Sequence, residues 1–127
     1  MRIYLIDDDE VSNFLFESML SGVGCAHDLR TFTSAEEALA ALGSCGTGGF
    51  PHLLFVDLSM PIMDGWELLE ELRQRHPAFG EKCRAYILTS SIRESDEARG
   101  KAHPLVTQFL NKPVSQEILQ SILSAAL

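Results

Sequence analysis

Short, continuous apolar runs alternate with helical patterns along the whole chain, and this alternation constrains the fold more than any other feature. Residues 3–6 (IYLI) and 53–56 (LLFV) are too short for helices, and their apolar character is typical of strands buried on both faces. Strands of this kind, separated by helices, form a parallel sheet that is covered on both sides. The pattern therefore predicts one α/β domain spanning residues 1–127.

We expect five strands alternating with five helices. The expected strands cover residues 3–6, 27–32, 53–56, 85–88 and 106–110, and the expected helices cover residues 10–20, 34–42, 64–76, 95–103 and 115–127. The glycine-rich stretch at residues 43–51 (GSCGTGGFP) predicts a surface loop.

Charge and composition exclude several classes of protein. Eighteen acidic residues against ten basic ones give a formal charge of −8, which argues against a nucleic-acid-binding surface. No apolar run approaches the roughly 20 residues of a membrane span, so no membrane insertion is expected. Three widely spaced cysteines form neither a metal nor a disulfide pattern and favour a cytoplasmic location. Because nothing follows Leu127, we expect no attached output domain.

Acidic side chains directly follow two of the predicted strands. Asp7, Asp8 and Asp9 come after the first strand, and Asp57 comes after the third. Because the carboxyl ends of parallel strands meet at one edge of a sheet, these carboxylates are expected to lie together and to repel one another. Mg²⁺ prefers carboxylate, water and phosphate oxygens and would relieve that repulsion. The sequence therefore predicts a magnesium site at this edge.

Asp57 is the candidate nucleophile of this site. It lies alone at its strand end between Val56 and Leu58, and a carboxylate can attack phosphorus to give an acyl phosphate. Phosphoryl transfer requires that the charge on the transferred oxygens be neutralised. Lys112, after the fifth strand, and the hydroxyl of Thr89, at the end of the fourth, could supply those contacts together with Mg²⁺.

Four short motifs carry a resemblance to a known family. They are LIDDDE near the start, FVDLSMPIMDG in the middle, LTS after the fourth strand and FLNKP after the fifth. In this combination the chain resembles the receiver domain of bacterial two-component response regulators, of the single-domain, chemotaxis-regulator-like kind. The resemblance covers essentially the whole sequence. It implies a flavodoxin-like fold with strand order 2-1-3-4-5 and a phosphoprotein that acts in phosphorelay signal transduction.

The resemblance also assigns roles to individual residues. Asp57 matches the phospho-acceptor, and Asp7 and Asp8 match the acidic pair that holds Mg²⁺. The other assignments are the backbone carbonyl of Ser59 as a further metal ligand, Thr89 as the switch hydroxyl, Phe109 as the switch aromatic, Lys112 as the invariant lysine, and a cis bond between Lys112 and Pro113.

Two assignments have an alternative in a neighbouring residue. The run of three acids also allows Asp8 and Asp9 as the pair, although the four apolar residues before Asp7 favour Asp7 and Asp8. Ser90 is an alternative switch hydroxyl, although Asp96 lies at the usual distance, seven residues after Thr89, and favours Thr89.

The implied partners are a histidine kinase or phosphotransfer protein as the phosphoryl donor, and a downstream protein. In the family, activated copies often pair through the segments that correspond to residues 95–103, 106–110 and 115–127. Rotation of roughly 100° per residue along the helix of residues 10–20 predicts that Phe14 is exposed and available to the donor. The residues expected to face the sheet are Val11, Leu15, Phe16, Met19 and Leu20.

Two other functions share part of the site. An aspartate-nucleophile phosphohydrolase of the haloacid dehalogenase type needs a second aspartate two residues after the nucleophile, where this chain has Ser59. A phosphorylation-independent scaffold would not need a complete set of acids and a lysine. We therefore expect a phospho-acceptor switch and not an enzyme, with self-phosphorylation from small donors and self-dephosphorylation as its only reactions.

Overall fold

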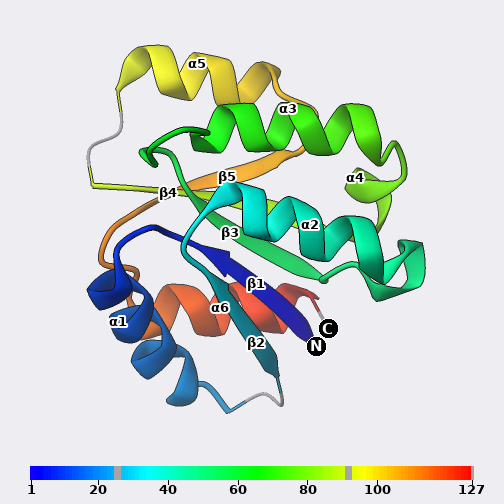
Figure 1. Cartoon of the computed structure of the whole chain (residues 1–127). Helices are drawn as coiled ribbons and strands as arrows, with labels where there is room; N and C mark the ends of the chain where they lie inside the picture. Colours follow the sequence, from blue (N-terminus) through cyan, green and yellow to red (C-terminus); the bar gives the residue numbers. More distant parts are fainter. Residues whose placement is uncertain (25–26, 91–92, 127) are drawn as a thin grey trace.

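A five-stranded parallel sheet forms the centre of the molecule in the computed structural model, which describes residues 1–24, 27–90 and 93–126 (Figure 1). The strand order is β2-β1-β3-β4-β5, and all four neighbouring pairs are parallel, as expected. The strands are β1 (Arg2–Ile6), β2 (Asp28–Phe32), β3 (Leu53–Asp57), β4 (Arg84–Thr89) and β5 (Val106–Asn111).

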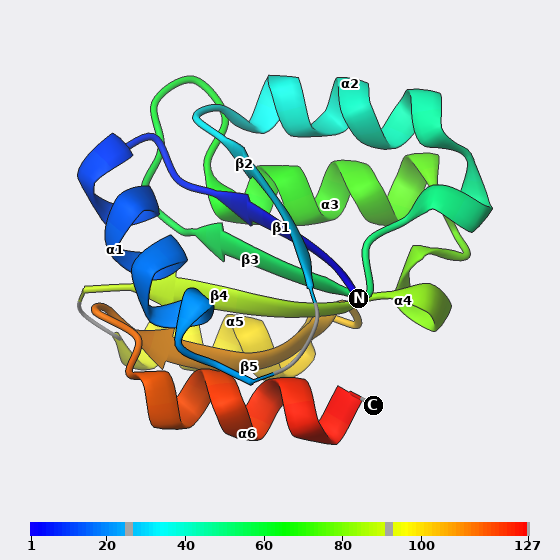
Figure 2. The same cartoon turned by 90° about the horizontal axis from the view of Figure 1, so that it is seen from below.

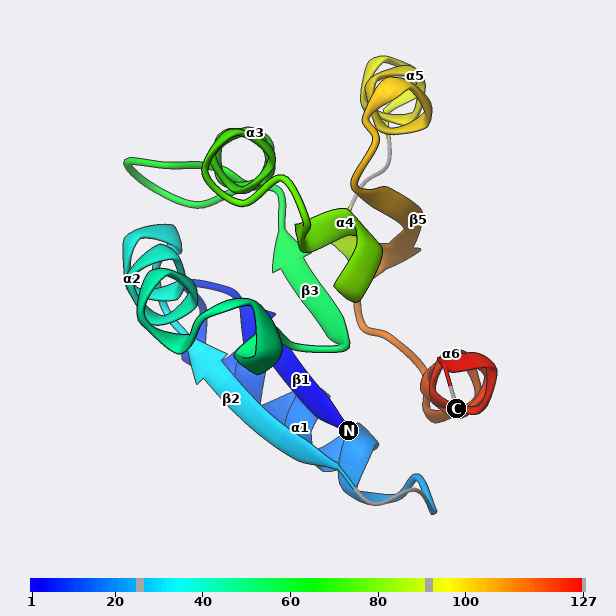
Figure 3. The same ribbon diagram turned by 90° about the vertical axis from the view of Figure 1, so that its right-hand side faces the viewer.

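Helices cover both faces of the sheet (Figures 1 and 2). They are α1 (Glu10–Ser21), α2 (Ala35–Cys45), α3 (Gly65–Arg75), α4 (Phe79–Lys82), α5 (Glu94–Ala102) and α6 (Gln116–Ala126), with a 3-10 turn, η1, at Thr47–Gly49. Figure 3 shows α1 and α6 on one side of the sheet and α2, α3 and α5 on the other. No helix of the described residues is both long and apolar enough to span a bilayer.

Two helical segments differ from the expectation. α2 continues through Gly43 to Cys45, and η1 occupies part of the expected glycine-rich loop. α4 is a sixth helix, one turn long, whose four residues are too few to show a helical period in the sequence. Its Phe79 is fully buried and packs against Phe50, with ring centroids 5.3 Å apart. A single apolar residue therefore anchors this turn.

The side chains of the central strands alternate between two apolar cores. Ile3 and Leu5 of β1 belong to the core under α1 and α6, whereas Tyr4 and Ile6 belong to the core under α2 and α3. All five residues of β3 are buried, as predicted for a strand covered on both faces. The carboxyl ends of β1 and β3 are thus held from both sides.

The buried face of α1 is not the one expected. Phe16 and Leu20 are buried as predicted, but the third buried residue is the polar Asn13. The buried residues centre roughly 80° away from the expected direction at about 100° per residue. The exposed apolar residues of this helix are Val11, Phe14, Leu15 and Met19. The exposure of Phe14 is therefore confirmed, and the predicted burial of the other three is wrong.

The two edge strands differ from the central ones. β5 contains one extra residue relative to β4: Ala85 pairs with Val106 and Tyr86 pairs with Gln108, so Thr107 lies between the two pairs. β2, at the other edge, presents the charged side chains of Asp28 and Arg30 to solvent. Neither edge is a flat apolar strand.

Candidate functional site

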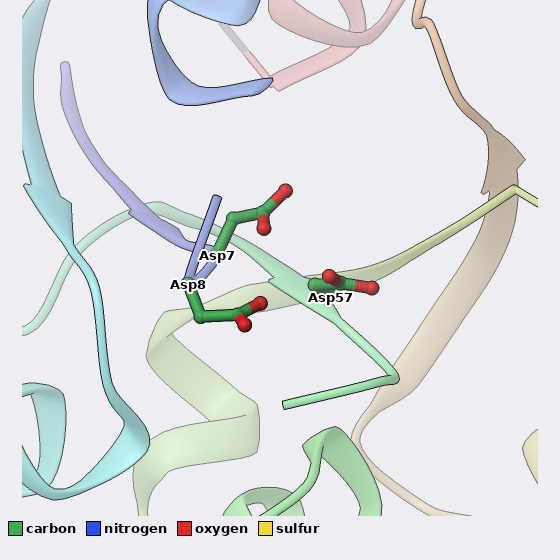
Figure 4. Close-up of side chains that lie close together, drawn as sticks. All are labelled: Asp7, Asp8 and Asp57. Carbon is green, nitrogen blue, oxygen red and sulfur yellow. The ribbon is translucent and has the colours of Figure 1, made fainter. Parts of the chain in front are cut away.

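Three carboxylates meet at the carboxyl edge of the sheet (Figure 4). Asp7 and Asp8 follow β1, and Asp57 is the last residue of β3. One oxygen of each carboxylate lies within 4.8 Å of the other two. Asp7 and Asp57 are buried, whereas Asp8 is exposed. The structure thus brings together the three acids that the sequence analysis singles out as metal ligands.

Lys112 reaches this acidic cluster from the segment after β5. Its Nζ donates to Oδ2 of Asp7 at 2.7 Å and to Oδ2 of Asp57 at 3.3 Å. Its backbone N–H donates to the carbonyl of Thr89 at 2.9 Å, which ties the segment to the end of β4. The bond between Lys112 and Pro113 is cis, as predicted. The lysine therefore bridges the two buried acids.

Burial and charge oppose each other at this site. Burial, and then the neighbouring charge of Asp7, raise the pKa of Asp57, although Lys112 partly offsets both. Burial alone would lower the pKa of Lys112, but its hydrogen bond to Asp7 and the charges of both acids hold that pKa above its usual value. The two buried carboxylates thus share the ammonium group of Lys112, and the site favours additional positive charge.

The acidic cluster fits a hard divalent cation. Its potential ligands from side chains are carboxylate oxygens, the type that Mg²⁺ prefers, and they come from Asp7, Asp8 and Asp57. The exposure of Asp8 leaves one side of the cluster open to water and to a phosphate group. A cation here would also relieve the repulsion between the buried acids.

Backbone contacts hold Asp57 in place. Its Oδ1 accepts a hydrogen bond from the backbone N–H of Ser59 at 3.2 Å. The N–H of Gly65 donates to the carbonyl of Leu58 at 3.0 Å, which brings the start of α3 close to the end of β3. A Cβ atom at Gly65 would lie only 2.7 Å from the carbonyl oxygen of Asp57. Glycine is therefore required at this position, beside the candidate nucleophile.

Asp9 has a separate structural role. Its side chain caps α1 by accepting from the backbone N–H of Val11 at 2.9 Å and of Ser12 at 3.4 Å. Asp7, in contrast, is buried and bonded to Lys112. Of the two pairs that the sequence allows, Asp7 and Asp8 are the ones that lie with Asp57.

The two candidate switch residues lie on neighbouring strands. Thr89 is buried at the end of β4, whereas Ser90 next to it is exposed. Phe109 is half-buried on β5, and its ring packs edge-on against Trp66 with centroids 5.9 Å apart. The Phe109 ring thus packs against Trp66 of α3.

An apolar cavity of about 500 Å³ adjoins the acidic cluster. Leu15, Phe16 and Met19 of α1 form one wall, and residues 112–114 form another. Asp7, Asp9 and Ser12 lie along its polar side. The cavity therefore extends from the acidic cluster to the exposed apolar face of α1.

Two residues with clear structural roles are absent from the sequence-based site. Asn13 donates from Nδ2 to the backbone carbonyl of Asp7 at 3.0 Å, and Gly100 lies against the ring of Phe109. The sequence carried a signal for each of them. A polar residue inside a helix and an isolated glycine in a helical pattern both indicate a role in packing or function. Their partners, however, could be found only in the folded chain.

The fold and this edge of the sheet define a doubly wound α/β protein of the flavodoxin-like class. More particularly, the family model of the response regulator receiver domain matches residues 3–124. The chain therefore belongs to the response regulator receiver domain family of two-component systems.

Individual relatives agree with this assignment. The DNA-binding transcriptional regulator NtrC of Salmonella typhimurium is 39% identical over 75 residues, which are 59% of this chain and 15% of NtrC. This chain thus spans only a small part of that regulator's length. The crystal structure of a two component response regulator from Cytophaga hutchinsonii is 26% identical, with a TM-score of 0.92 over 98% of this chain and 95% of that one.

A metal-bound relative is also similar. The Mn(2+)-bound form of response regulator Rcp1 is 26% identical to this chain, with a TM-score of 0.77. The similarity covers 97% of this chain and 91% of that one.

Proposed function

We propose that this chain is a phosphorylation switch that accepts a phosphoryl group on Asp57 and then changes its protein-binding surface. The observation that carries the proposal is the contact of one lysine with two buried acids, at 2.7 Å to Asp7 and 3.3 Å to Asp57. This arrangement leaves Asp57 as a carboxylate at a strand end. Once a cation is bound, that cation and Lys112 favour the approach of an anionic phosphoryl group.

The proposed reaction is a direct transfer. A carboxylate oxygen of Asp57 attacks the phosphorus of a phosphohistidine on a histidine kinase or phosphotransfer protein. A phosphorus–oxygen bond forms, the phosphorus–nitrogen bond breaks, and the electron pair returns to the imidazole. Lys112 and the Thr89 hydroxyl then contact the phosphoryl oxygens. Asp7, Asp8, Asp57 and the Ser59 carbonyl would hold Mg²⁺, which supplies positive charge toward those oxygens.

The proposed cellular setting follows from the same role. The donor is expected to cover the rim of the acidic cluster and the exposed face of α1. A downstream protein, or a second phosphorylated copy, would bind through α5, β5 and α6. We place the reaction in the cytoplasm, which agrees with the free thiols of Cys45 and Cys83.

The experiment that tests the acceptor is intact-mass measurement after incubation with acetyl phosphate and Mg²⁺. We expect one added phosphoryl group on the wild type and none on Asp57→Asn or after chelation of the metal. Asp28→Asn is the matched control, because Asp28 is an exposed acid at the far edge strand, and it should be phosphorylated fully.

Two outcomes would contradict the proposal. One is an adduct that persists in Asp57→Asn, because the acceptor would then be another residue. The other is the release of many phosphates per chain from p-nitrophenyl phosphate, because a phosphohydrolase turns over and an acceptor does not.

A further inference from the structure

α5 is attached to the rest of the molecule by very few buried side chains. Its sequence, ESDEARGKA, is mostly charged, and Gly100 is the only buried residue between Glu94 and Ala102. The guanidinium of Arg99 lies 4.8 Å from the centre of the Trp66 ring on α3. Gly100 itself faces β5. The position of α5 therefore depends mainly on what occupies the space beside Gly100.

The ring of Phe109 occupies that space. A Cβ atom built on Gly100 would lie 2.1 Å from Cε2, 2.7 Å from Cζ and 3.2 Å from Cδ2 of Phe109. The first two distances are far below van der Waals contact, so this ring position and a side chain at residue 100 exclude each other. The Phe109 ring also contacts the ring of Trp66, and the two ring centroids lie 5.9 Å apart.

We propose that Gly100 is a positioning residue for the switch: by lacking a side chain, it lets Phe109 rest against α5 in the unmodified chain. The inference rests on the proposed function, with Phe109 as its switch aromatic, and adds that the ring leaves this position when Asp57 is phosphorylated. A methyl group at residue 100 displaces the ring without any phosphoryl group. Gly100→Ala therefore shifts the protein toward the conformation that the phosphoryl group stabilises.

Linkage makes this inference measurable. If the methyl group and the phosphoryl group favour the same conformation, each raises the apparent affinity of the other. Beryllium fluoride, a phosphoryl analogue, should then bind Gly100→Ala more tightly than wild type, by about fivefold or more. Trp66 is the only tryptophan and contacts Phe109, so its emission follows the ring directly.

The experiment is a beryllium fluoride titration in the presence of Mg²⁺, read by Trp66 emission and by the rate of phosphorylation from acetyl phosphate. For Gly100→Ala we expect tighter binding, faster phosphorylation, and an emission spectrum without ligand that is closer to that of the liganded wild type. Gly43→Ala is the matched control: it is also a helical glycine, but its Cβ would meet nothing within 4 Å. It should behave like wild type.

A double variant separates displacement of the ring from stabilisation of the helix. In Gly100→Ala/Phe109→Ala the methyl group has no ring to displace, so the affinity should equal that of Phe109→Ala alone. If Gly100→Ala binds beryllium fluoride no more tightly than wild type, the inference is overturned. If wild type itself takes no phosphoryl group on Asp57, the proposed function fails instead.

Amide hydrogen exchange in the wild type gives a test that needs no variant. Departure of the ring removes the main buried contact of α5, so beryllium fluoride should accelerate exchange around residue 100. Unchanged exchange there, with normal binding of the analogue, would overturn the inference even if Gly100→Ala fails to fold.

Discussion

Ile62 is under the clearest backbone constraint among the residues near the site. It lies five positions after Asp57, and its φ is +72°, the one positive value outside glycine in the described residues. Left-handed backbone costs an L-residue roughly 1–2 kcal/mol, and a β-branched side chain fits it poorly. The side chain is 90% exposed, so burial returns little of that cost.

Replacing Ile62 by glycine should therefore stabilise the fold. Glycine adopts positive φ without strain, although its greater freedom in the unfolded chain offsets part of the gain. We expect Ile62→Gly to be more stable than Ile62→Ala by about 1 kcal/mol, because alanine keeps the Cβ that causes the strain. Urea denaturation of both variants measures the difference, and equal midpoints would show that the backbone at residue 62 is relaxed.

The functional role of an individual residue could be predicted from the sequence only where the residue type itself determines that role. Asp7, Asp57 and Lys112 could be singled out because acids and a lysine at strand ends must meet in a parallel sheet. Asn13 and Gly100 could not, because their roles depend on partners that the fold supplies: the backbone of Asp7 and the ring of Phe109. Neither partner has a fixed sequence distance from the residue that needs it.

Among the helices, α1 differs most from a simple amphipathic design. Four of its apolar residues are exposed, although the helical period predicts this for Phe14 alone. Two of the four, Leu15 and Met19, line the cavity beside the acidic cluster. The average direction of the apolar residues was wrong because it counted Val11, Leu15 and Met19 as core residues. It could not count the polar Asn13, whose side-chain amide is buried and donates to the Asp7 carbonyl. The helix thus presents an apolar strip on the side from which, under the proposed function, a phosphoryl donor approaches Asp57.

Phe14 provides a test of this strip, since its side chain is 66% exposed. Phe14→Ala should slow phosphotransfer from the cognate kinase by about tenfold, the loss of ~1.4 kcal/mol typical of an interface anchor. Acetyl phosphate needs no docking, so its rate should stay at the wild-type value. Equal losses with both donors would point to damage of the site and remove the docking role.

Element boundaries were predictable where a cap or a buried run marks them. Asp64 and Glu67 form a capping box at the start of α3, so this helix begins where the sequence indicates. α4 carries no side-chain cap and spans one turn, and only the packing of Phe79 in the folded chain reveals it. Tertiary contact, not local preference, decides such short elements.

His103 connects several elements at the level of the whole molecule. Its Nδ1 accepts from the backbone N–H of Leu105 at 3.2 Å, and its Nε2 lies 3.5 Å from Glu70 of α3. Burial lowers the pKa of His103 more than the charge of Glu70 raises it, and Arg73 and Arg99 lower it further. The folded protein therefore favours the neutral imidazole.

A pH dependence of stability follows from this shift. Because the unfolded chain binds a proton more readily at His103, the stability that this residue contributes is present above about pH 6.5 and is lost as the pH falls below it. The urea concentration at the unfolding midpoint of the wild type should decrease when the pH is lowered from 7 to 5. That of His103→Gln should decrease less. Identical pH profiles for the two proteins would mean that His103 titrates alike in both states.

The two sheet edges described above also decide how copies of this protein can assemble. An open edge strand is a template for strand addition, which is the route to extended sheets and fibrils. The extra residue at Thr107 interrupts the regular backbone hydrogen bonding of β5. In β2, the exposed charged side chains of Asp28 and Arg30 flank the backbone at the edge of the sheet. Self-association through side-chain surfaces is then favoured over strand addition, so a concentrated sample should not grow extended β-sheet fibrils.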